Sequence, residues 1–401
     1  MKITELVTVR MEIQPNLLYL QVHTDEGPIG LGETFWGADA VQAYVHETMA
    51  PQVLGRDPLR IGEHARRLQG VLGLNGTGVE TRGNSALDIA LWDLLGQVSG
   101  QPLHRLLGGR QADDLRIYNT CAGYSYAQGE SVSVAHWGVA KRPSEASEPY
   151  EDLDAFMNRA DELALSLLEQ GISGMKIWPF DPAAEAGRGM SISNAALDAA
   201  LEPFRKIRAA VGERMDIMVE FHSLWNLPTA RRIAHALEEF SPYWLEDPIR
   251  PDNLETLADF AASVKTPVAL SETIAGASLF RRLVQSGAAS VVMFDIGWAG
   301  GISEARRLGA IADEYHLPFA VHDCTGPVNL AAATAVAISA PNGLIQETVR
   351  AFYHGWYQDI VTALPPITNG RIQPLEAPGL GMALQPDLAG RPGVTVRRSG
   401  N

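Results

Sequence analysis

Three glutamates recur at similar intervals, and each follows a short apolar segment that has the composition of a strand. They are Glu220 in IMVEFH, Glu246 in YWLEDP and Glu272 in VALSET. Three carboxylates on neighbouring strands would form an all-oxygen site of the kind that Mg²⁺ prefers, and the cation would relieve their mutual repulsion. The alternative interpretation is three rim glutamates, each with a Lys or Arg partner.

The same series continues along the chain with a carboxylate, a histidine and a further carboxylate. Asp295 in VVMFD and His322 in FAVHD end adjacent segments, and Glu347 in LIQET ends the next one. A carboxylate beside a histidine fixes its tautomer, so this pair predicts a general base with its partner. Glu347 could be a protonated acid that donates a hydrogen bond to a developing oxyanion. The alternatives are an ordinary surface histidine and a glutamate stabilised by a helix dipole.

Three more residues are predicted to face the same cavity. His222 lies two residues beyond Glu220, so the strand period of two places both side chains on one face. Lys176, in GMKIW, could neutralise a substrate carboxylate, although a structural ion pair is equally consistent with its spacing. Trp178 shares the face of Lys176 and is predicted to pack there or to stack on a substrate.

The intervals between these residues each hold one helix-sized pattern and a return to an apolar run. Strands that alternate with helices in this way predict parallel βαβ units, and a (β/α) barrel carries its catalytic groups at the C-terminal ends of its strands. We expect strands over 115–124, 172–178, 216–221 and 343–347, four more ending near Glu246, Glu272, Asp295 and His322, and helices over 153–169 and 195–210 and near 227–240, 254–264, 276–286, 302–315 and 327–340.

The length requires a second domain, because 401 residues exceed one barrel of about 250 residues. A strand over 2–12, a hairpin over 16–24 and 28–35 and a helix over 84–97 indicate an α+β unit before the barrel. The predicted fold class is therefore α/β, a modified TIM (β/α) barrel with an α+β capping domain. The expected boundaries are 1–112 for the cap, 113–362 for the barrel and 363–401 for a segment that returns to the cap. Segments 125–150 and 179–193 are predicted to be loops.

Composition excludes several classes of partner. The net charge is −15 and no basic run occurs, so we expect no nucleic-acid binding. An apolar run of about 18 residues is absent from the sequence, so we expect neither a membrane span nor a signal peptide. Cys121 and Cys324 are too few for a disulfide framework, which predicts reduced thiols and a cytoplasmic protein.

Taken together, the motifs resemble the enolase superfamily and, within it, the mandelate racemase group. The resemblance extends over nearly the whole chain and is carried by GPIGLGE, SALDIALWDLLGQ, GQPLHRLLGG, the strand ends, WAGGI and PGLG. It implies a small-molecule substrate, Mg²⁺ as the cofactor, a homo-oligomer, and removal of a proton next to a carboxylate to give an enediolate that Mg²⁺ stabilises.

The resemblance also assigns roles to individual residues. Glu220, Glu246 and Glu272 match the metal ligands, His322 with Asp295 matches the base and its partner, and Glu347 matches the acid that hydrogen-bonds the enolate oxygen. Lys176 matches the first lysine of the group's Lys-x-Lys motif, whereas Trp178 replaces the second lysine, which is usually the base on the opposite face. Glu220-Phe221-His222 is similar to the Asp-x-His of galactonate dehydratase-like members, in which the histidine is a general acid.

These matches imply a sugar acid dehydratase, a lyase that acts on an aldonate or aldarate and yields a 2-keto-3-deoxy acid. A racemase or epimerase with His222 as the second base is one alternative, and a cycloisomerase is another. A non-catalytic barrel that only binds a ligand is an alternative of a different class. We expect substrate specificity to reside in about 13–37, 125–150 and 179–192.

Overall fold

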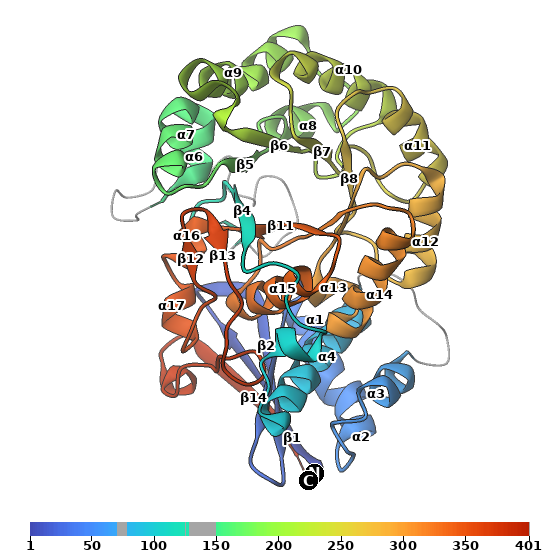
Figure 1. Cartoon of the computed structure of the whole chain (residues 1–401), viewed down its shortest axis with the longest axis vertical. Helices are drawn as coiled ribbons and strands as arrows, with labels where there is room; N and C mark the ends of the chain where they lie inside the picture. The colour runs from blue at the N-terminus through green and yellow to red at the C-terminus, as the bar shows by residue number, and fades with distance from the viewer. Residues whose placement is uncertain (70–77, 125, 128–149, 401) are drawn as a thin grey trace.

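The computed structural model describes residues 1–69, 78–124, 126–127 and 150–400. Most of the predicted loop over 125–150 therefore lies outside the described residues. Figure 1 shows two units, a ring of strands and helices and, below it, a smaller sheet flanked by helices, beside which both chain ends lie. In the part of the chain that is described, no helix has the length and apolar character needed to cross a membrane.

Eight parallel strands form the closed barrel that the sequence predicts. In chain order they are β4 (Leu115–Thr120), β5 (Gly174–Ile177), β6 (Asp216–Glu220), β7 (Trp244–Glu246), β8 (Val268–Leu270), β9 (Val291–Phe294), β10 (Phe319–Val321) and β11 (Gly343–Thr348). Each strand pairs with the next, and β11 pairs with β4 to close the ring. Buried side chains fill the interior, as in other barrels of this kind: Tyr118, Met218, Trp244, Ala269, Val291, Met293, Ala320 and Ile345.

Helices cover the outside of the barrel between successive strands. The principal ones are α6 (Asp152–Asn158), α7 (Ala160–Glu169), α9 (Asn194–Val211), α10 (Leu227–Leu237), α11 (Leu254–Ala262), α12 (Ala277–Ser286), α14 (Gly301–Glu314) and α15 (Pro327–Ser339). Side-chain caps fix where three of them begin, because Ser193, Asn226 and Asn253 each accept a hydrogen bond from a backbone N–H three residues later.

Two local predictions about these segments were wrong. The helix expected over 153–169 is divided into α6 and α7 at Arg159, whose φ of −138° lies outside the helical range. The segment 179–193, predicted to be a loop, contains the short helix α8 (Asp181–Gly187). Three further short helices follow barrel strands: α13 (Ile296–Ala299), α16 (Arg350–Tyr353) and α17 (Tyr357–Ile360).

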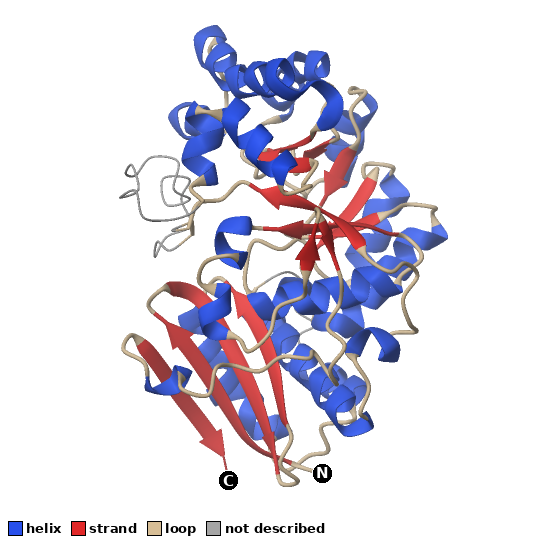
Figure 2. Cartoon of the chain, turned by 60° about the vertical axis from the view of Figure 1, so that its left-hand side comes forward, coloured by secondary structure: helices blue, strands red, loops and turns tan. Residues whose placement is uncertain are grey.

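The cap is built on a four-stranded antiparallel sheet in the order β14-β1-β2-β3. Its strands are β1 (Ile3–Met11), β2 (Gln14–Thr24), β3 (Ile29–Phe35) and β14 (Val394–Gly400), and its helices are α1 (Ala38–Ala43), the π-helix η1 (Tyr44–Met49), α2 (Ala50–Val53), α3 (Ile61–Leu68), α4 (Val79–Ser99) and α5 (Leu103–Leu106). The long helix α4 lies against β3, and Figure 2 shows the sheet as a separate layer beside the barrel.

Glycines permit the close approach of β3 to α4. A Cβ atom at Gly32 would lie 1.8 Å from the carbonyl oxygen of Ala86, and one at Gly30 would lie 2.1 Å from that of Ala90. Any larger residue would push the helix away from the sheet. The contact matters for the site, because α4 and β3 both reach the mouth of the barrel.

The C-terminal residues return to both units. A short hairpin of β12 (Ile367–Thr368) and β13 (Arg371–Ile372) extends the barrel sheet, since β13 pairs antiparallel with β4. The last strand, β14, pairs antiparallel with β1 along the outer edge of the capping sheet. The capping sheet is therefore assembled from the two ends of the chain.

Candidate active site

The three glutamates singled out in the sequence meet at one end of the barrel. Glu220 and Glu246 are the last residues of β6 and β7, and Glu272 lies two residues beyond β8. One oxygen from each carboxylate lies within 4.8 Å of the others. Glu220 and Glu246 are buried, and the indole N–H of Trp244 donates a hydrogen bond of 2.9 Å to Glu246.

This carboxylate cluster suits a divalent cation. Burial raises the pKa of Glu220 well above its ordinary value, and the adjacent Glu246 raises it further against the opposing effect of Lys176. Burial likewise raises the pKa of Glu272. Crowded buried carboxylates resist ionisation unless positive charge is supplied, and an all-oxygen set of hard ligands favours Mg²⁺ among the common divalent metals. The residues present therefore fit a magnesium site.

Lys176 connects this cluster to Glu347. Its Nζ lies 2.5 Å from Glu246, 2.9 Å from Glu347 and 3.5 Å from Glu220. Burial lowers the pKa of Lys176, but Glu246 and Glu347 outweigh burial and hold it well above the ordinary value, so the side chain is an ammonium. A fixed positive charge thus lies between the cluster of three glutamates and the carboxylate of Glu347 on β11.

The charges around Glu347 favour its ionised form, whereas the sequence interpretation was a protonated acid. Burial raises its pKa, whereas Lys176, His322 and a hydrogen bond from Thr120 lower it, and the resulting pKa is about 2. Its oxygens also accept a hydrogen bond of 2.9 Å from the backbone N–H of Asp323. The carboxylate is an acceptor of several donors, and neighbouring positive charge, which sequence spacing does not reveal, decides its protonation state.

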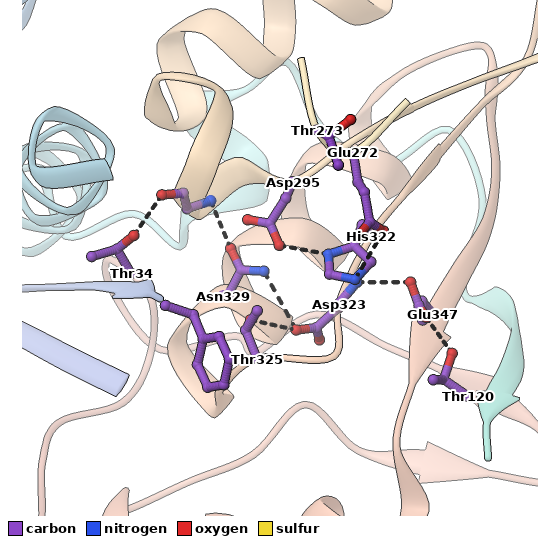
Figure 3. A network of polar contacts seen from close by, with 12 residues as sticks. Thr34, Thr120, Glu272, Thr273, Asp295, His322, Asp323, Thr325, Asn329 and Glu347 are labelled. Atoms are coloured by element: carbon purple, nitrogen blue, oxygen red, sulfur yellow. Dashed lines mark hydrogen bonds and ion pairs between the residues drawn. The ribbon is translucent and has the colours of Figure 1, made fainter. Parts of the chain in front are cut away.

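His322 lies between two carboxylates, as Figure 3 shows. Its Nδ1 is 2.8 Å from Oδ2 of Asp295 and its Nε2 is 3.1 Å from Oε2 of Glu272. Burial lowers the pKa of His322, but Glu272, Glu347 and Asp295 raise it to about 10. Asp295 orients the ring through Nδ1, and Nε2 lies beside the cluster of three glutamates.

His222 has a carboxylate partner of its own, which the sequence interpretation missed. Its Nδ1 lies 2.8 Å from Oδ2 of Asp181, the first residue of α8, whose side chain is fully buried. The backbone N–H of His222 donates a hydrogen bond of 2.6 Å to Glu220, and its φ of 50° is in the left-handed region. The edge of the ring packs against Trp178, with centroids 5.7 Å apart.

A cavity of about 400 Å³ brings these groups together with residues from the cap. Lys176, Trp178, His222 and His322 line it from the barrel, where Trp178 is only 1% exposed. Of the described residues, the cap contributes Phe35, Trp36, Gly37, Gly78, Val79 and Arg82 to the lining. The volume is in the range of small-molecule sites.

A chain of polar contacts joins the cap to the catalytic end of the barrel. Thr34, on β3, donates a hydrogen bond of 2.7 Å to the carbonyl of Gly297, whose N–H donates to Asn329 at 3.0 Å. The Asn329 amide lies 3.4 Å from Asp323, whose backbone N–H reaches Glu347. Figure 3 shows this chain leading from Thr34 to the residues around His322.

Sequence reasoning missed three charged residues near the site. Asp181 was assigned to a loop, and Arg82 comes from another domain, so strand spacing carries no signal for either. Asp247 follows Glu246 directly, and its side chain is buried and lines the cavity. A carboxylate next to a predicted ligand was a signal that could have been used.

The fold and the site define a capped (β/α)₈-barrel protein with a cluster of three glutamates at the strand ends. The chain belongs to the mandelate racemase/muconate lactonizing enzyme family of the enolase superfamily: residues 6–108 match the N-terminal domain of that family, and residues 159–388 match the enolase C-terminal domain-like family.

Individual relatives agree with this assignment over almost their full length. A D-galactonate dehydratase of Variovorax paradoxus is 30% identical over 95% of this chain and 92% of its own, and a D-xylonate dehydratase of Haloferax volcanii is 28% identical over 96% and 87%. An enolase of the mandelate racemase subgroup from Agrobacterium tumefaciens has 50% identity and a TM-score of 0.88, covering 100% of this chain and 99% of that one. An enolase from Sargasso Sea environmental sequence has 40% identity and the same TM-score and coverage.

Proposed function

We propose that this protein is a Mg²⁺-dependent dehydratase of a sugar acid, an aldonate or an aldarate. It removes the proton next to the carboxylate, eliminates the 3-hydroxyl and yields a 2-keto-3-deoxy acid. The observation that carries the proposal is that two histidines, each held by its own aspartate, line one cavity beside a three-carboxylate site. The relatives named as sugar acid dehydratases support the reaction type.

Glu220, Glu246 and Glu272 would hold Mg²⁺, and the bound ion would supply positive charge next to the substrate carboxylate. The ammonium of Lys176 adds a second positive charge on the side of the cavity where Glu347 lies. An ion pair of 2.9 Å with Glu347 holds this ammonium in place. Both charges favour a transition state in which negative charge develops on the carboxylate as the neighbouring C–H bond breaks.

His322 takes the C2 proton through Nε2, while Asp295 holds Nδ1 and stabilises the resulting imidazolium. His222, which lines the same cavity and is oriented by Asp181, gives a proton to the 3-hydroxyl as the C3–O bond breaks. The leaving group departs as water, and the enol product tautomerises to the 2-keto acid. The net change is the loss of one water molecule from the substrate.

Trp178 occupies the position of a second lysine base and has no group that exchanges a proton with C2. It packs against Phe156 and His222, with ring centroids 5.1 and 5.7 Å away, and would form a wall of the substrate site. A two-base racemisation would therefore depend on His222. Epimerisation with His222 as the second base is the second candidate function, because its contact with Asp181 suits a base as well as an acid.

The test is a screen of a sugar-acid library with the Mg²⁺-loaded protein, in which 2-keto acid formation is detected with semicarbazide. The expected result is keto acid from at least one sugar acid, together with C2 proton exchange that His322→Asn abolishes. His235→Asn is the matched control, because that histidine contacts only the carbonyl of Ser263 among the described hydrogen bonds and lies on α10, outside the cavity lining.

The alternatives give different results. Inversion at C2 without keto acid would establish epimerisation, and exchange at the wild-type rate in His322→Asn would reject His322 as the base. Absence of both exchange and keto acid with every sugar acid would reject the proposed reaction. The cytoplasmic location and the homo-oligomeric state remain predictions. Size-exclusion chromatography with light scattering tests the oligomeric state.

A further inference from the structure

An arginine of the cap, Arg82, places a positive charge in the cavity at the mouth of the barrel. Arg82 lies in the second turn of α4 and lines the same cavity as Lys176 and His322. Its guanidinium carbon is 4.4 Å from the centre of the Trp298 ring, and one of its N–H groups donates a hydrogen bond to the backbone carbonyl of Phe35. The charge is thus held between a barrel residue and the end of β3.

Arg82 remains charged in this position. Burial lowers its pKa to about 10, with Asp295 and Glu272 acting in the opposite direction. A guanidinium is more weakly hydrated than an ammonium and binds carboxylates through two parallel N–H groups. An arginine in the wall of this cavity is therefore suited to an anionic ligand group.

Two tryptophans line the same cavity. The indole nitrogens of Trp178 and Trp298 are buried and have no hydrogen-bond partner within the residues that the structure describes, and the two side chains are 1% and 5% exposed. Buried N–H groups are nearly always paired, so these two indoles are exceptions within the wall of the cavity. The guanidinium of Arg82 is the positively charged donor that the cap adds to this wall.

Arg82 is not needed to attach α4 to the barrel, because other contacts do so further along the helix. Asp88 accepts hydrogen bonds from the backbone N–H and hydroxyl of Ser303, at 2.9 and 2.6 Å, and Ser85 accepts one of 2.9 Å from Gly300. Arg82 is one turn closer to the cavity than Ser85. Arg82 therefore lines the cavity, whereas the later turns of α4 attach the helix to the barrel.

We propose that Arg82 binds a second carboxylate on the end of the substrate that faces the cap, so that the protein prefers an aldarate to the corresponding aldonate. This inference rests on the proposed function and narrows its substrate class. The first carboxylate would lie at the three glutamates and Lys176, and the chain of hydroxyl groups would extend toward Arg82, Trp178 and Trp298.

The test compares a hexarate with the hexonate of the same configuration at C2 to C5, so that only the terminal carbon differs. Wild-type protein is expected to have the higher kcat/KM for the hexarate. Arg82→Gln should lower the hexarate-to-hexonate ratio by about 10- to 100-fold, mainly through the KM of the hexarate, because a charge-assisted contact is lost. Arg306→Gln is the control, since Arg306 lies 5.5 Å over the Trp92 ring and outside the cavity lining.

A wild-type preference for the hexonate, or an unchanged ratio in Arg82→Gln, would overturn the inference. Calorimetric binding of each acid to the Mg²⁺-loaded His322→Asn protein, with and without Arg82→Gln, provides a readout that does not require turnover. If no sugar acid yields a keto acid but the hexarate binds more tightly only when Arg82 is present, the proposed reaction fails and the binding inference stands. Circular dichroism verifies that each variant is folded. If Arg82→Gln is not folded, the preference of the wild-type protein for the hexarate or the hexonate decides whether the inference holds.

Discussion

Nδ1 of His222 lies 2.8 Å from Oδ2 of Asp181, the same distance that separates Nδ1 of His322 from Oδ2 of Asp295. Both aspartate side chains are fully buried, and the two pairs come from different elements of the barrel. In each pair the aspartate holds Nδ1 and thereby orients the ring, while Nε2 of His322 lies 3.1 Å from Glu272. Two histidine–aspartate pairs thus line the cavity, although only one of them was recognised as a pair from the sequence.

Asp181→Asn should separate the two halves of the proposed reaction. The uncharged amide holds the His222 ring less well and stabilises its imidazolium less, so elimination should fall on the order of 100-fold while C2 proton exchange continues. Exchange and keto acid formation are measured together in deuterated buffer by NMR. Asp198→Asn, on the exposed surface of α9, is the control. An equal loss of exchange and elimination would indicate a general structural defect and refute a specific role for Asp181.

Binding of Mg²⁺ should release protons. The pKa values of Glu220 and Glu272 are raised by burial and by their neighbours, so the metal-free cluster retains protons that a cation displaces. Calorimetry in buffers of different ionisation enthalpy measures the number released. Glu246→Gln should weaken binding by at least about 10-fold, because one charged ligand is lost. Glu238→Gln is the matched control, because Glu238 forms an ion pair with the exposed Lys265 at the surface. Equal Mg²⁺ affinity in the Glu246→Gln and Glu238→Gln variants would argue against this metal site.

His322 should titrate at unusually high pH in the metal-free protein. Its pKa is raised from 6.5 to about 10, so its ion pairs stabilise the fold fully below pH 6.5 and lose that effect as pH rises through about 10. Added Mg²⁺ would neutralise the charge of Glu272 and should therefore lower the pKa of His322. A lower pKa favours the neutral imidazole, which is the form that acts as a base. NMR titration of the imidazole with and without Mg²⁺ measures both values, and His322→Asn identifies the signal. A pKa near 6.5 without metal would contradict the expected effect of the three carboxylates.

His46 should make the cap sensitive to acid. It is buried between β1 and β14, with ring nitrogens 2.8 Å from the hydroxyls of Thr8 and Ser399, and burial followed by the charge of Arg397 lowers its pKa to about 4. The unfolded chain binds a proton more readily, so stability is full above pH 6.5 and is lost as pH falls through about 4. Thermal unfolding between pH 7 and 4 should show a shallower decline for His46→Gln. The exposed His316→Gln should follow the wild type, and three identical profiles would exclude His46 as the cause.

The sequence predicted the barrel well because parallel strands and their covering helices repeat at a regular interval. Glu220 and Glu246 are the last residues of their strands, while Glu272 and His322 lie one or two residues beyond theirs. Because the ends of neighbouring parallel strands meet at one side of the barrel, their position in the sequence was enough to predict that these side chains lie close together. Arg82 reaches the cavity from a helix of the cap, and such contacts depend on how two domains pack. The ionised state of Glu347 depends on Lys176, an ion pair between strands that are distant in sequence.

The pairing of β14 with β1 has a consequence for biosynthesis. Residues 5–11 find their outer strand partner only in residues 394–400, at the other end of the chain. During translation the barrel strands emerge from the ribosome before residues 394–400, so one edge of the capping sheet remains unpaired until those residues appear. Nascent chains stalled before residue 394 would expose the backbone of β1, an edge that chaperones or a second nascent chain could recognise.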